Sequence, residues 1–297
     1  MAAAPRHPAE AAGGDVVAYF DSDFAHTDLA PTAAPLLASI PTLDAAAAQQ
    51  YLDPDDGAGG SWEAFYKLHA RSATVYRPRN YLPLAFPELI DDQGARGGNR
   101  PRALLEVGCG LGSSLAAVLE RNPTIRCFAC DLSETALGLL RAKLPPQHAD
   151  RVQPFRCDVT EQPDVLRARV PEGSVDFALL IFTLSAVDPR RHVAVLRHLH
   201  AVLRPRSGML CFRDYGLWDM TQLRSKLRLE EDLFARQDGT LSYFFSPEYF
   251  TRLLRECGGW EMMECKYACV RNVNRATGQV MDRVFLHAKA RAVDVKA

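Results

Sequence analysis

The chain has 297 residues and a net charge of −1, with 47% hydrophobic and 24% charged residues, proportions that are ordinary for a globular protein. This length is enough for one large domain with a full core. The longest apolar run, residues 177–187, is interrupted by polar side chains and is shorter than the roughly 18 residues of a membrane-spanning helix. We therefore expect no membrane segment. The first residues also lack the apolar stretch of a secretory signal.

Charge is unevenly distributed along the chain. Residues 1–60 contain Arg6 as their one Lys or Arg beside nine acidic residues, a net charge of −8, whereas residues 61–297 have a net charge of +7. The first part is rich in alanine, proline and glycine, which predicts a mobile acidic leader with room for a short helix over residues 43–52. A leader so poor in arginine is unlike a mitochondrial transit peptide, which leaves the cytosol or the nucleus. The basic remainder suits a polyanionic partner, although this charge is also within ordinary scatter.

After the leader, an aromatic segment precedes the core of the chain. Trp62 and Tyr66 follow Ser61, a candidate N-cap, at helical spacing with a further aromatic residue between them. A glycine-rich stretch over residues 94–99 then ends this entry segment. The expected parts of the chain are residues 1–60, 61–100 and 101–291.

From residue 101 onward, strand patterns alternate with helix patterns. Strands are predicted over residues 103–106, 125–131, 152–158, 175–184, 209–214, 261–270 and 280–289. Helices are predicted over residues 111–121, 133–143, 192–203 and 246–257, the last with Ser246 as N-cap, Pro247 at its first position and Gly258 as its end. This alternation predicts a doubly wound α/β fold, with a mostly parallel sheet that helices cover on both faces.

Eight cysteines are scattered along the chain, as in a reduced intracellular protein. Cys127 and Cys130 have the spacing of a metal or redox pair, but both fall on a predicted strand. Residues three apart on a strand point to opposite faces of the sheet. We therefore interpret them as small core residues and expect no metal site.

A glycine-rich loop, Glu106-Val-Gly-Cys-Gly-Leu-Gly112, follows the first core strand and opens a helix. Gly108 and Gly110 allow a tight turn and a close approach of the backbone to a ligand, and the helix N-terminus offers free N–H groups. This pattern fits dinucleotide binding as well as S-adenosylmethionine binding. Asp131, 23 residues after Gly108, ends the next strand and is placed to accept hydrogen bonds from the ribose hydroxyls of an adenosine.

A second acid sharpens the prediction of an adenosine site. Asp158 ends the third predicted strand and Val159 follows it. In methyltransferases an acid at this place accepts from the adenine amine while the next side chain packs on the ring, and Ile181 on the fourth strand lies beside it. Each acid alone also fits a helix cap or a turn. Asp131 and Asp158 together with the glycine loop favour the adenosine interpretation.

Several catalytic motifs are absent from the sequence. It contains no Asn-Pro-Pro-Tyr or Asp-Pro-Pro-Tyr to position an exocyclic amine, no Pro-Cys for a covalent thiolate, and no motif of Ser–His catalysis. His192, His198 and His200 share one predicted helix and are interpreted as surface or packing residues. We therefore expect direct transfer to an atom that is already nucleophilic.

Several segments make the chain similar to the methyltransferase-like enzymes that form 3-methylcytidine in tRNA. They are Trp62–Lys67, Leu105–Gly112, Phe128–Asp131, Leu180–Val187, Phe212–Gly216, Arg236–Thr240, Ser242–Phe245 and Arg283–Leu286. The resemblance covers residues 61–290. It implies a class I methyltransferase fold with seven strands and an antiparallel terminal pair. It also implies direct transfer from S-adenosylmethionine to N3 of cytidine in a tRNA loop, with the anticodon loop as the expected place.

The resemblance also implies roles for individual residues. The cofactor contacts that it implies are Trp62, Tyr66, Gly108, Asp131, Asp158, Val159 and Ile181, and the glycine loop adds Gly110 as a candidate. Aromatic faces attract a cationic sulfonium, so the first two would form a lid over the cofactor, although an amphipathic helix packing its aromatic residues on the core explains them too. The entry segment, residues 61–100, thus becomes a cofactor-lid and substrate segment.

For the substrate, an acid can read cytosine by accepting from N4, and Asp214 and Asp238 are the candidates. Tyr215 or Tyr243 could stack on the base. Arg213 and Arg236 could hold phosphate or orient the acids. The alternative for Arg213 and Asp214 is a structural ion pair at the end of a strand.

The chain departs from the family pattern in two places. Family members often have Lys-Asp-Arg-His-Trp where this chain has Arg77-Pro-Arg-Asn-Tyr81, so Arg79 is kept while Asn80 and Tyr81 differ. The acidic leader also differs from the charged helical leader of the family. Some members need a partner such as an aminoacyl-tRNA synthetase. Rival hypotheses are a methyltransferase for a small molecule or protein, a NAD-linked enzyme, and a non-catalytic scaffold.

Overall fold

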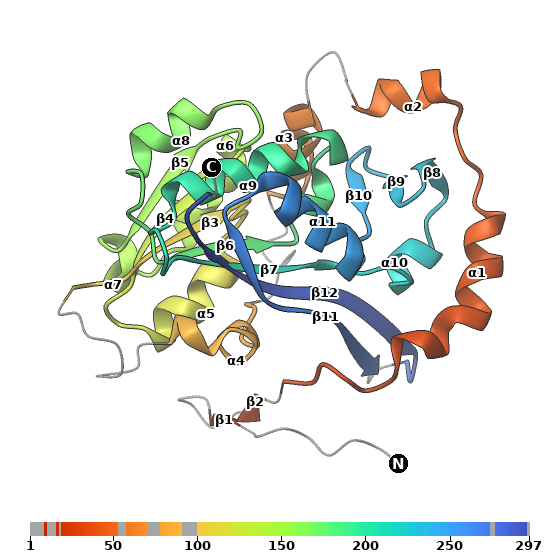
Figure 1. The fold of residues 1–297 in the computed structure, drawn as a ribbon, viewed down its shortest axis with the longest axis horizontal. Helices are drawn as coiled ribbons and strands as arrows, with labels where there is room; N and C mark the ends of the chain where they lie inside the picture. Colours follow the sequence, from red (N-terminus) through yellow and green to blue (C-terminus); the bar gives the residue numbers. More distant parts are fainter. Residues whose placement is uncertain are drawn as a thin grey trace.

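The computed structural model describes residues 9–10, 16–17, 19–52, 58–70, 78–90, 100–273 and 277–295. Its centre is a seven-stranded sheet in the order β11-β12-β7-β6-β3-β4-β5 (Figure 1). Neighbours from β7 to β5 are parallel, while β12 pairs antiparallel with both β7 and β11. The predicted doubly wound, mostly parallel sheet with an antiparallel terminal pair is confirmed.

The predicted strands and helices of the core occur in the predicted order, and one longer helix that was not predicted, α8 (Pro163–Arg169), lies among them. The strands are β3 (Ala103–Val107), β4 (Arg126–Asp131), β5 (Val152–Arg156), β6 (Phe177–Ile181), β7 (Met209–Tyr215), β11 (Trp260–Val273) and β12 (Val280–Ala292). The longer helices between them are α5 (Ser113–Arg121), α6 (Glu134–Lys143), α8 (Pro163–Arg169), α9 (His192–Val202) and α11 (Pro247–Cys257). Shorter pieces are α4 (Leu82–Ala85), α7 (Pro146–Ala149), α10 (Met220–Leu223), η2 (Pro87–Leu89), η3 (Leu184–Ala186) and η4 (Pro189–Arg191).

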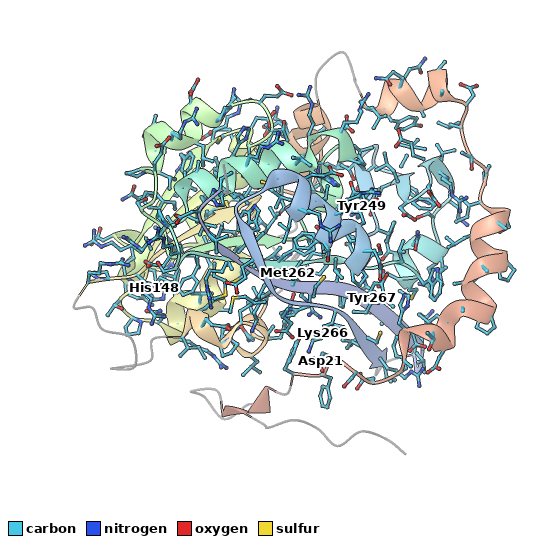
Figure 2. The ribbon with its side chains drawn as sticks, in the orientation of Figure 1. Asp21, His148, Tyr249, Met262, Lys266 and Tyr267 are labelled. Atoms are coloured by element: carbon cyan, nitrogen blue, oxygen red, sulfur yellow. The ribbon has the colours of Figure 1, made fainter. Side chains whose placement is uncertain are left out.

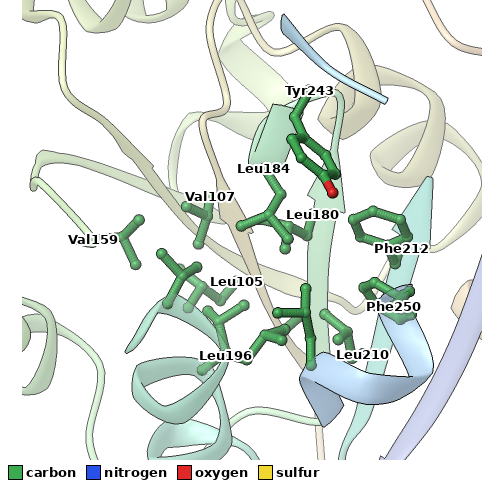
Figure 3. Packing of buried hydrophobic residues seen from close by; sticks show 14 of the residues in the cluster. Leu105, Val107, Val159, Leu180, Leu184, Leu196, Leu210, Phe212, Tyr243 and Phe250 are labelled. Carbon is green, nitrogen blue, oxygen red and sulfur yellow. The ribbon is translucent and has the colours of Figure 1, made fainter. Parts of the chain in front are cut away.

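Alternate side chains of the central strands form two separate buried clusters. Leu105 and Leu210 join the cluster beneath α9 and α11 (Figure 3), whereas Leu104 joins the cluster beneath α4 and α5. Cys130 lies in the first cluster and Cys127 in the second, which confirms that this pair points to opposite faces of the sheet. No helix in the described part of the chain is long and apolar enough to cross a membrane.

A small antiparallel sheet beside the main one was not predicted. It consists of β8 (Leu227–Glu230), β9 (Leu233–Ala235) and β10 (Leu241–Tyr243). Its strands have only three or four residues, too few for a periodic pattern to be recognised. The turn between β9 and β10 carries the Arg236–Thr240 motif.

The structure packs much of the acidic leader against the domain, although its composition predicted mobility. Two two-residue strands, β1 (Ala9–Glu10) and β2 (Val16–Val17), precede η1 (His26–Leu29), α1 (Ala30–Ser39) and α2 (Ala45–Leu52). Ser22 pairs with Cys269 at the edge of β11, and Asp21 forms a 2.7 Å ion pair with Lys266 (Figure 2). The edge of a sheet offers backbone groups to any neighbouring segment, and composition cannot reveal this. The glycine-rich stretch 94–99 lies outside the described residues.

Candidate active site

A cavity of about 590 Å³ opens at the carboxyl ends of β3 to β7. Such sheets bind ligands where the strand order reverses, which here is between β3 and β6. All eight predicted cofactor residues line this cavity: Trp62, Tyr66, Gly108, Gly110, Asp131, Asp158, Val159 and Ile181. Of the predicted substrate residues, Tyr215 and Arg236 line it as well.

The glycine loop after β3 leaves no room for a side chain at Gly108 or Gly110. Gly108 and Gly110 have positive φ angles of 65° and 50°, which residues other than glycine rarely adopt. A Cβ atom at Gly108 would lie 2.5 Å from the side chain of Thr183. At Gly110 it would lie 2.6 Å from the hydroxyl of Tyr66. The loop therefore fits closely between the end of β6 and the aromatic segment.

Asp131 is held by the glycine loop itself. Its Oδ2 atom accepts a hydrogen bond from the backbone N–H of Gly110 at 2.8 Å, and Oδ1 accepts from that of Ser133 at 2.9 Å. Burial raises the pKa of Asp131, and these two backbone donors oppose the shift. A carboxylate has about four acceptor positions, so Asp131 keeps acceptor capacity for a ligand hydroxyl.

Asp158 and two apolar side chains form the neighbouring wall. Asp158 Oδ1 accepts hydrogen bonds from the backbone N–H and the hydroxyl of Thr160, at 2.8 and 2.6 Å. Asp158 thus shapes a turn and also lines the cavity. Val159 and Ile181 are almost fully buried, and they give this wall an apolar surface suited to a flat ring.

The aromatic segment forms helix α3 (Ala58–His69) over the cavity. The rings of Trp62 and Tyr66 lie 6.1 Å apart. Glu63, between them in sequence, accepts hydrogen bonds from the hydroxyls of Ser133 and Thr135, each at 2.6 Å. These bonds lower the pKa of Glu63 to about 2. The sequence prediction missed Glu63, although it lies inside the Trp62–Lys67 motif.

Asp214 supports the cavity from behind. It is fully buried, and its Oδ2 atom accepts from the backbone N–H of Ser185 at 3.0 Å, while Oδ1 accepts from that of Tyr215 at 2.8 Å. Burial raises the pKa of Asp214 to about 6. Its carboxylate is therefore engaged in holding the turn after β6.

Arg213 points away from Asp214, because successive residues of a strand face opposite sides of the sheet. Its guanidinium donates to the hydroxyl of Tyr19 at 3.0 Å. It also lies 5.2 Å from the ring centroid of Tyr81 and 4.7 Å from that of Phe285. Arg213 thus joins the leader, the entry segment and β12, and it forms no ion pair with Asp214.

The remaining predicted substrate residues lie in or beside the small sheet. Asp238 accepts from the backbone N–H and the hydroxyl of Thr240 at 3.1 and 2.6 Å, and its carboxylate is 3.9 Å from Arg236. Tyr243 is buried in the core cluster (Figure 3), and its ring centroid lies 4.8 Å from that of Tyr249. Thus Arg236 lines the cavity, Asp238 holds the turn that carries Arg236, and Tyr243 packs in the core cluster.

Comparison with known proteins agrees with this geometry. Residues 105–210 match the family model described as a methyltransferase domain. The human tRNA N(3)-cytidine methyltransferase METTL6 is 37% identical over 243 residues, which cover 81% of this chain and 82% of the human protein. The chain belongs to the tRNA N(3)-cytidine methyltransferase family.

Further members and a solved structure extend this comparison. The Drosophila melanogaster tRNA N(3)-methylcytidine methyltransferase Mettl2 is 33% identical, with 77% of this chain and 70% of that protein covered. A Haloferax volcanii complex of the Trm112 methyltransferase activator with a putative methyltransferase matches with a TM-score of 0.54. At 14% identity, it covers 80% of this chain and 97% of that chain. This structural match supports the class I methyltransferase fold of this family member.

Other lining residues of this tRNA N(3)-cytidine methyltransferase family member were not predicted as site residues. They include Arg79, Phe182, Arg283 and Phe285. Arg283 is fixed by Asp219, which accepts from its Nε atom at 2.8 Å and from its Nη2 atom at 3.2 Å. Sequence spacing could not place them beside the glycine loop, because they come from the entry segment, the end of β6 and the last strand.

Proposed function

We propose that this chain is an S-adenosylmethionine-dependent methyltransferase that methylates N3 of cytidine in a tRNA loop, in the cytosol or the nucleus. The observation that carries the proposal is the 37% identity to a tRNA N(3)-cytidine methyltransferase over 81% of the chain. The cavity at the strand ends supports it, because the residues that the resemblance implied for the cofactor come together there. We extend the proposal to the anticodon loop as the target.

The cavity fits S-adenosylmethionine, which supplies an electrophilic methyl group on a sulfonium. Its volume of about 590 Å³ is typical of sites for ligands of this size. In our proposal the free acceptor positions of Asp131 bind the ribose hydroxyls. Asp158 accepts from the adenine amine, with Val159 and Ile181 against the ring. Trp62 and Tyr66 cover the sulfonium, where an aromatic face attracts positive charge, and Gly108 and Gly110 line the floor.

The chemistry asks the protein for position more than for proton transfer. Cytosine N3 carries a lone pair at neutral pH, so it can attack the methyl group without a base, and correct placement then lowers the barrier. The N3 atom is engaged in a base pair within a duplex, so the base must be unpaired or flipped out. We propose that Tyr215 and Arg236 contact this base or its phosphate.

Asp214 and Asp238 were predicted to read cytosine N4, and we now propose that both act by positioning. Asp214 holds the backbone of Ser185 in the turn after β6, and Asp238 holds the turn that presents Arg236. Arg213 and Tyr243, also predicted at the substrate, do not line the cavity, and we propose that they support its walls through their packing. A protein helper such as an aminoacyl-tRNA synthetase would then deliver the tRNA to the cavity.

The decisive experiment follows a labelled methyl group. Tissue-derived total tRNA is incubated with the protein and methyl-labelled S-adenosylmethionine, with and without cell extract, and its nucleosides are separated by mass spectrometry. We expect label in 3-methylcytidine. Label in another nucleoside, or no label even with extract, refutes the proposal.

A matched pair of variants ties this activity to the cavity. Asp131→Ala should lose binding of S-adenosylhomocysteine in calorimetry, because the acceptor for the ribose is gone. Asp150→Ala, which changes an exposed acid after α7, should bind like the wild type. Tighter binding of NAD than of S-adenosylhomocysteine would favour a dinucleotide enzyme instead.

A further inference from the structure

Phe182 has an unusual backbone conformation at the end of β6. Its φ angle is +55°, in the left-handed region that bulky side chains rarely adopt. The sequence pattern predicted a strand that continues to residue 184. In the structure the strand ends at Ile181, and Phe182 turns the chain out of the sheet. Strained residues of this kind persist where the surrounding structure holds them, and they concentrate at functional sites.

Several hydrogen bonds hold the turn that Phe182 begins. Its own backbone N–H donates to the carbonyl of Arg213 at 2.9 Å. The N–H of Ser185 donates to the carboxylate of Asp214 at 3.0 Å. The Nε2 atom of His192 lies 3.0 Å from the carbonyl oxygen of Leu184 and 3.1 Å from that of Val187. Residues of β7 and the first residue of α9 thus hold the strained conformation.

The turn places the ring of Phe182 in the wall of the cavity, among aromatic and basic side chains. The ring is part-buried, and its centroid lies 5.2 Å from that of Tyr215 and 5.4 Å from that of Phe285. The guanidinium of Arg79 lies 5.2 Å from the Phe182 ring, and that of Arg283 lies 5.0 Å from the Phe285 ring. All five residues line the cavity.

We propose that the ring of Phe182 is the surface on which the target base stacks, in the part of the cavity next to the methyl donor. Ile181 precedes it in the chain and lies in the proposed cofactor wall, so Phe182 marks the boundary between the two ligands. Aromatic rings bind unpaired bases by stacking, and arginines beside them suit the attached phosphates. This inference rests on the proposed function, and it identifies a residue that positions the base.

A purely structural role for Phe182 predicts something different. The ring also packs against the core cluster beneath α4 and α5, and a ring with that role alone would not affect tRNA methylation once the protein is folded. Glycine adopts this backbone without strain. The Phe182→Gly variant therefore removes the ring while it relieves the turn, which separates the two roles.

The test compares Phe182→Gly, Phe182→Tyr and the control Phe20→Ala, which changes an exposed ring of the leader. We expect Phe182→Gly to lower kcat/KM for tRNA by about 5- to 150-fold, the usual size of a base-stacking contact. Its affinity for S-adenosylhomocysteine should stay within about twofold of the wild type. Phe182→Tyr keeps a stacking ring and should restore kcat/KM to within about threefold, and Phe20→Ala should match the wild type.

A second readout separates this inference from the proposed function. Saturation-transfer NMR with cytidine 5′-monophosphate, in the presence of S-adenosylhomocysteine, should show contact to the wild type and not to Phe182→Gly. Methylation by Phe182→Gly at the wild-type rate overturns the inference alone. If the wild type makes no 3-methylcytidine, the proposed function fails, and the NMR difference then decides the base site: loss of contact in the variant supports it and equal contact overturns it.

Discussion

The carboxylate of Glu63 accepts a hydrogen bond from the hydroxyl of Ser133 at 2.6 Å, which fastens helix α3 to the start of α6. Thr135 in the same turn donates a second bond at 2.6 Å. A carboxylate is favoured at this place because the N-terminus of a helix carries partial positive charge. Helix α3, which carries the aromatic residues of the proposed lid, is therefore attached to the segment that begins after Asp131.

Replacing Glu63 should loosen the lid and weaken cofactor binding. Glu63→Gln loses the charge at the helix N-terminus, and we expect the Kd for S-adenosylhomocysteine to rise about three- to tenfold in calorimetry. Glu134→Gln, which breaks an exposed ion pair with Arg141 on the same helix, is the matched control and should bind normally. Unchanged binding by Glu63→Gln contradicts a role of this bond in the lid.

The pKa of Glu63 also predicts a pH dependence. Since it is lowered from 4.5 to about 2, the bonded form is fully present above pH 4.5. The contribution of the ionised Glu63 carboxylate to the free energy of unfolding is lost as the pH falls from 4.5 through about 2.

The close approach of Tyr66 to the glycine loop predicts a rescue. Gly110→Ala places a Cβ atom 2.6 Å from the Tyr66 hydroxyl and also strains a left-handed backbone by about 1–2 kcal/mol. We expect it to weaken cofactor binding strongly. Tyr66→Phe in the same chain removes the clash but leaves the strain, so the double variant should recover part of the lost affinity. Additive effects of the two substitutions would argue that Tyr66 does not cover the loop.

The two acids predicted for the substrate can be tested by single substitutions. In the wild type, the carboxylate of Asp214 accepts hydrogen bonds from two backbone N–H groups. In Asp214→Asn, the amide NH₂ group faces one of these donors and cannot accept from it, so the turn after β6 should shift. We expect kcat/KM for tRNA to fall roughly 10- to 100-fold, with cofactor affinity within about threefold. Asp238→Ala frees the turn that presents Arg236 and should act in the same direction.

A control on the surface completes this test. Asp164→Asn changes an acid whose side chain is 93% exposed and should leave turnover unchanged. Wild-type turnover in both Asp214→Asn and Asp238→Ala would refute the positioning roles proposed for these two acids.

His192 predicts a stability difference that depends on pH. Burial lowers its pKa from 6.5 to about 4, so the unfolded chain takes up a proton below pH 6.5 while the folded chain does not until about pH 4. The free energy of unfolding should therefore fall across this range by about 3 kcal/mol on account of His192. Glu106 and Asp214, with pKa values raised to about 7 and 6, act with the opposite sign.

The contribution of His192 is therefore measured as a difference between variants. Urea denaturation of the wild type and His192→Gln at pH 7 and pH 5 should show a smaller gap at pH 5. Gln147→Ala, which changes an exposed side chain without a titrating group on the short helix α7, serves as the control and should keep a constant gap. A gap that does not change for His192→Gln would show that this histidine is not held in its neutral form.

The order of the core elements was predictable from sequence because strand patterns alternate with amphipathic helix patterns from residue 101 onward. The predicted N-cap Ser246 marked the start of α11, and it accepts the expected backbone bond. The small sheet was not predictable, because its strands are too short to show a period. The packing of residues 19–52 was not predictable either, because it depends on contacts such as those of His26 with Trp218 and Tyr267.

The sequence by itself determined the glycine loop and the acids at two strand ends, because parallel strands bring consecutive carboxyl ends to one edge. The tertiary structure alone decided what each polar group touches. Asp214 meets the backbone of Ser185, and Glu63 meets the start of α6, across 29 and 70 residues of chain. Pairings over such separations follow from the packing of the sheet and its helices, and no local pattern of residues encodes them.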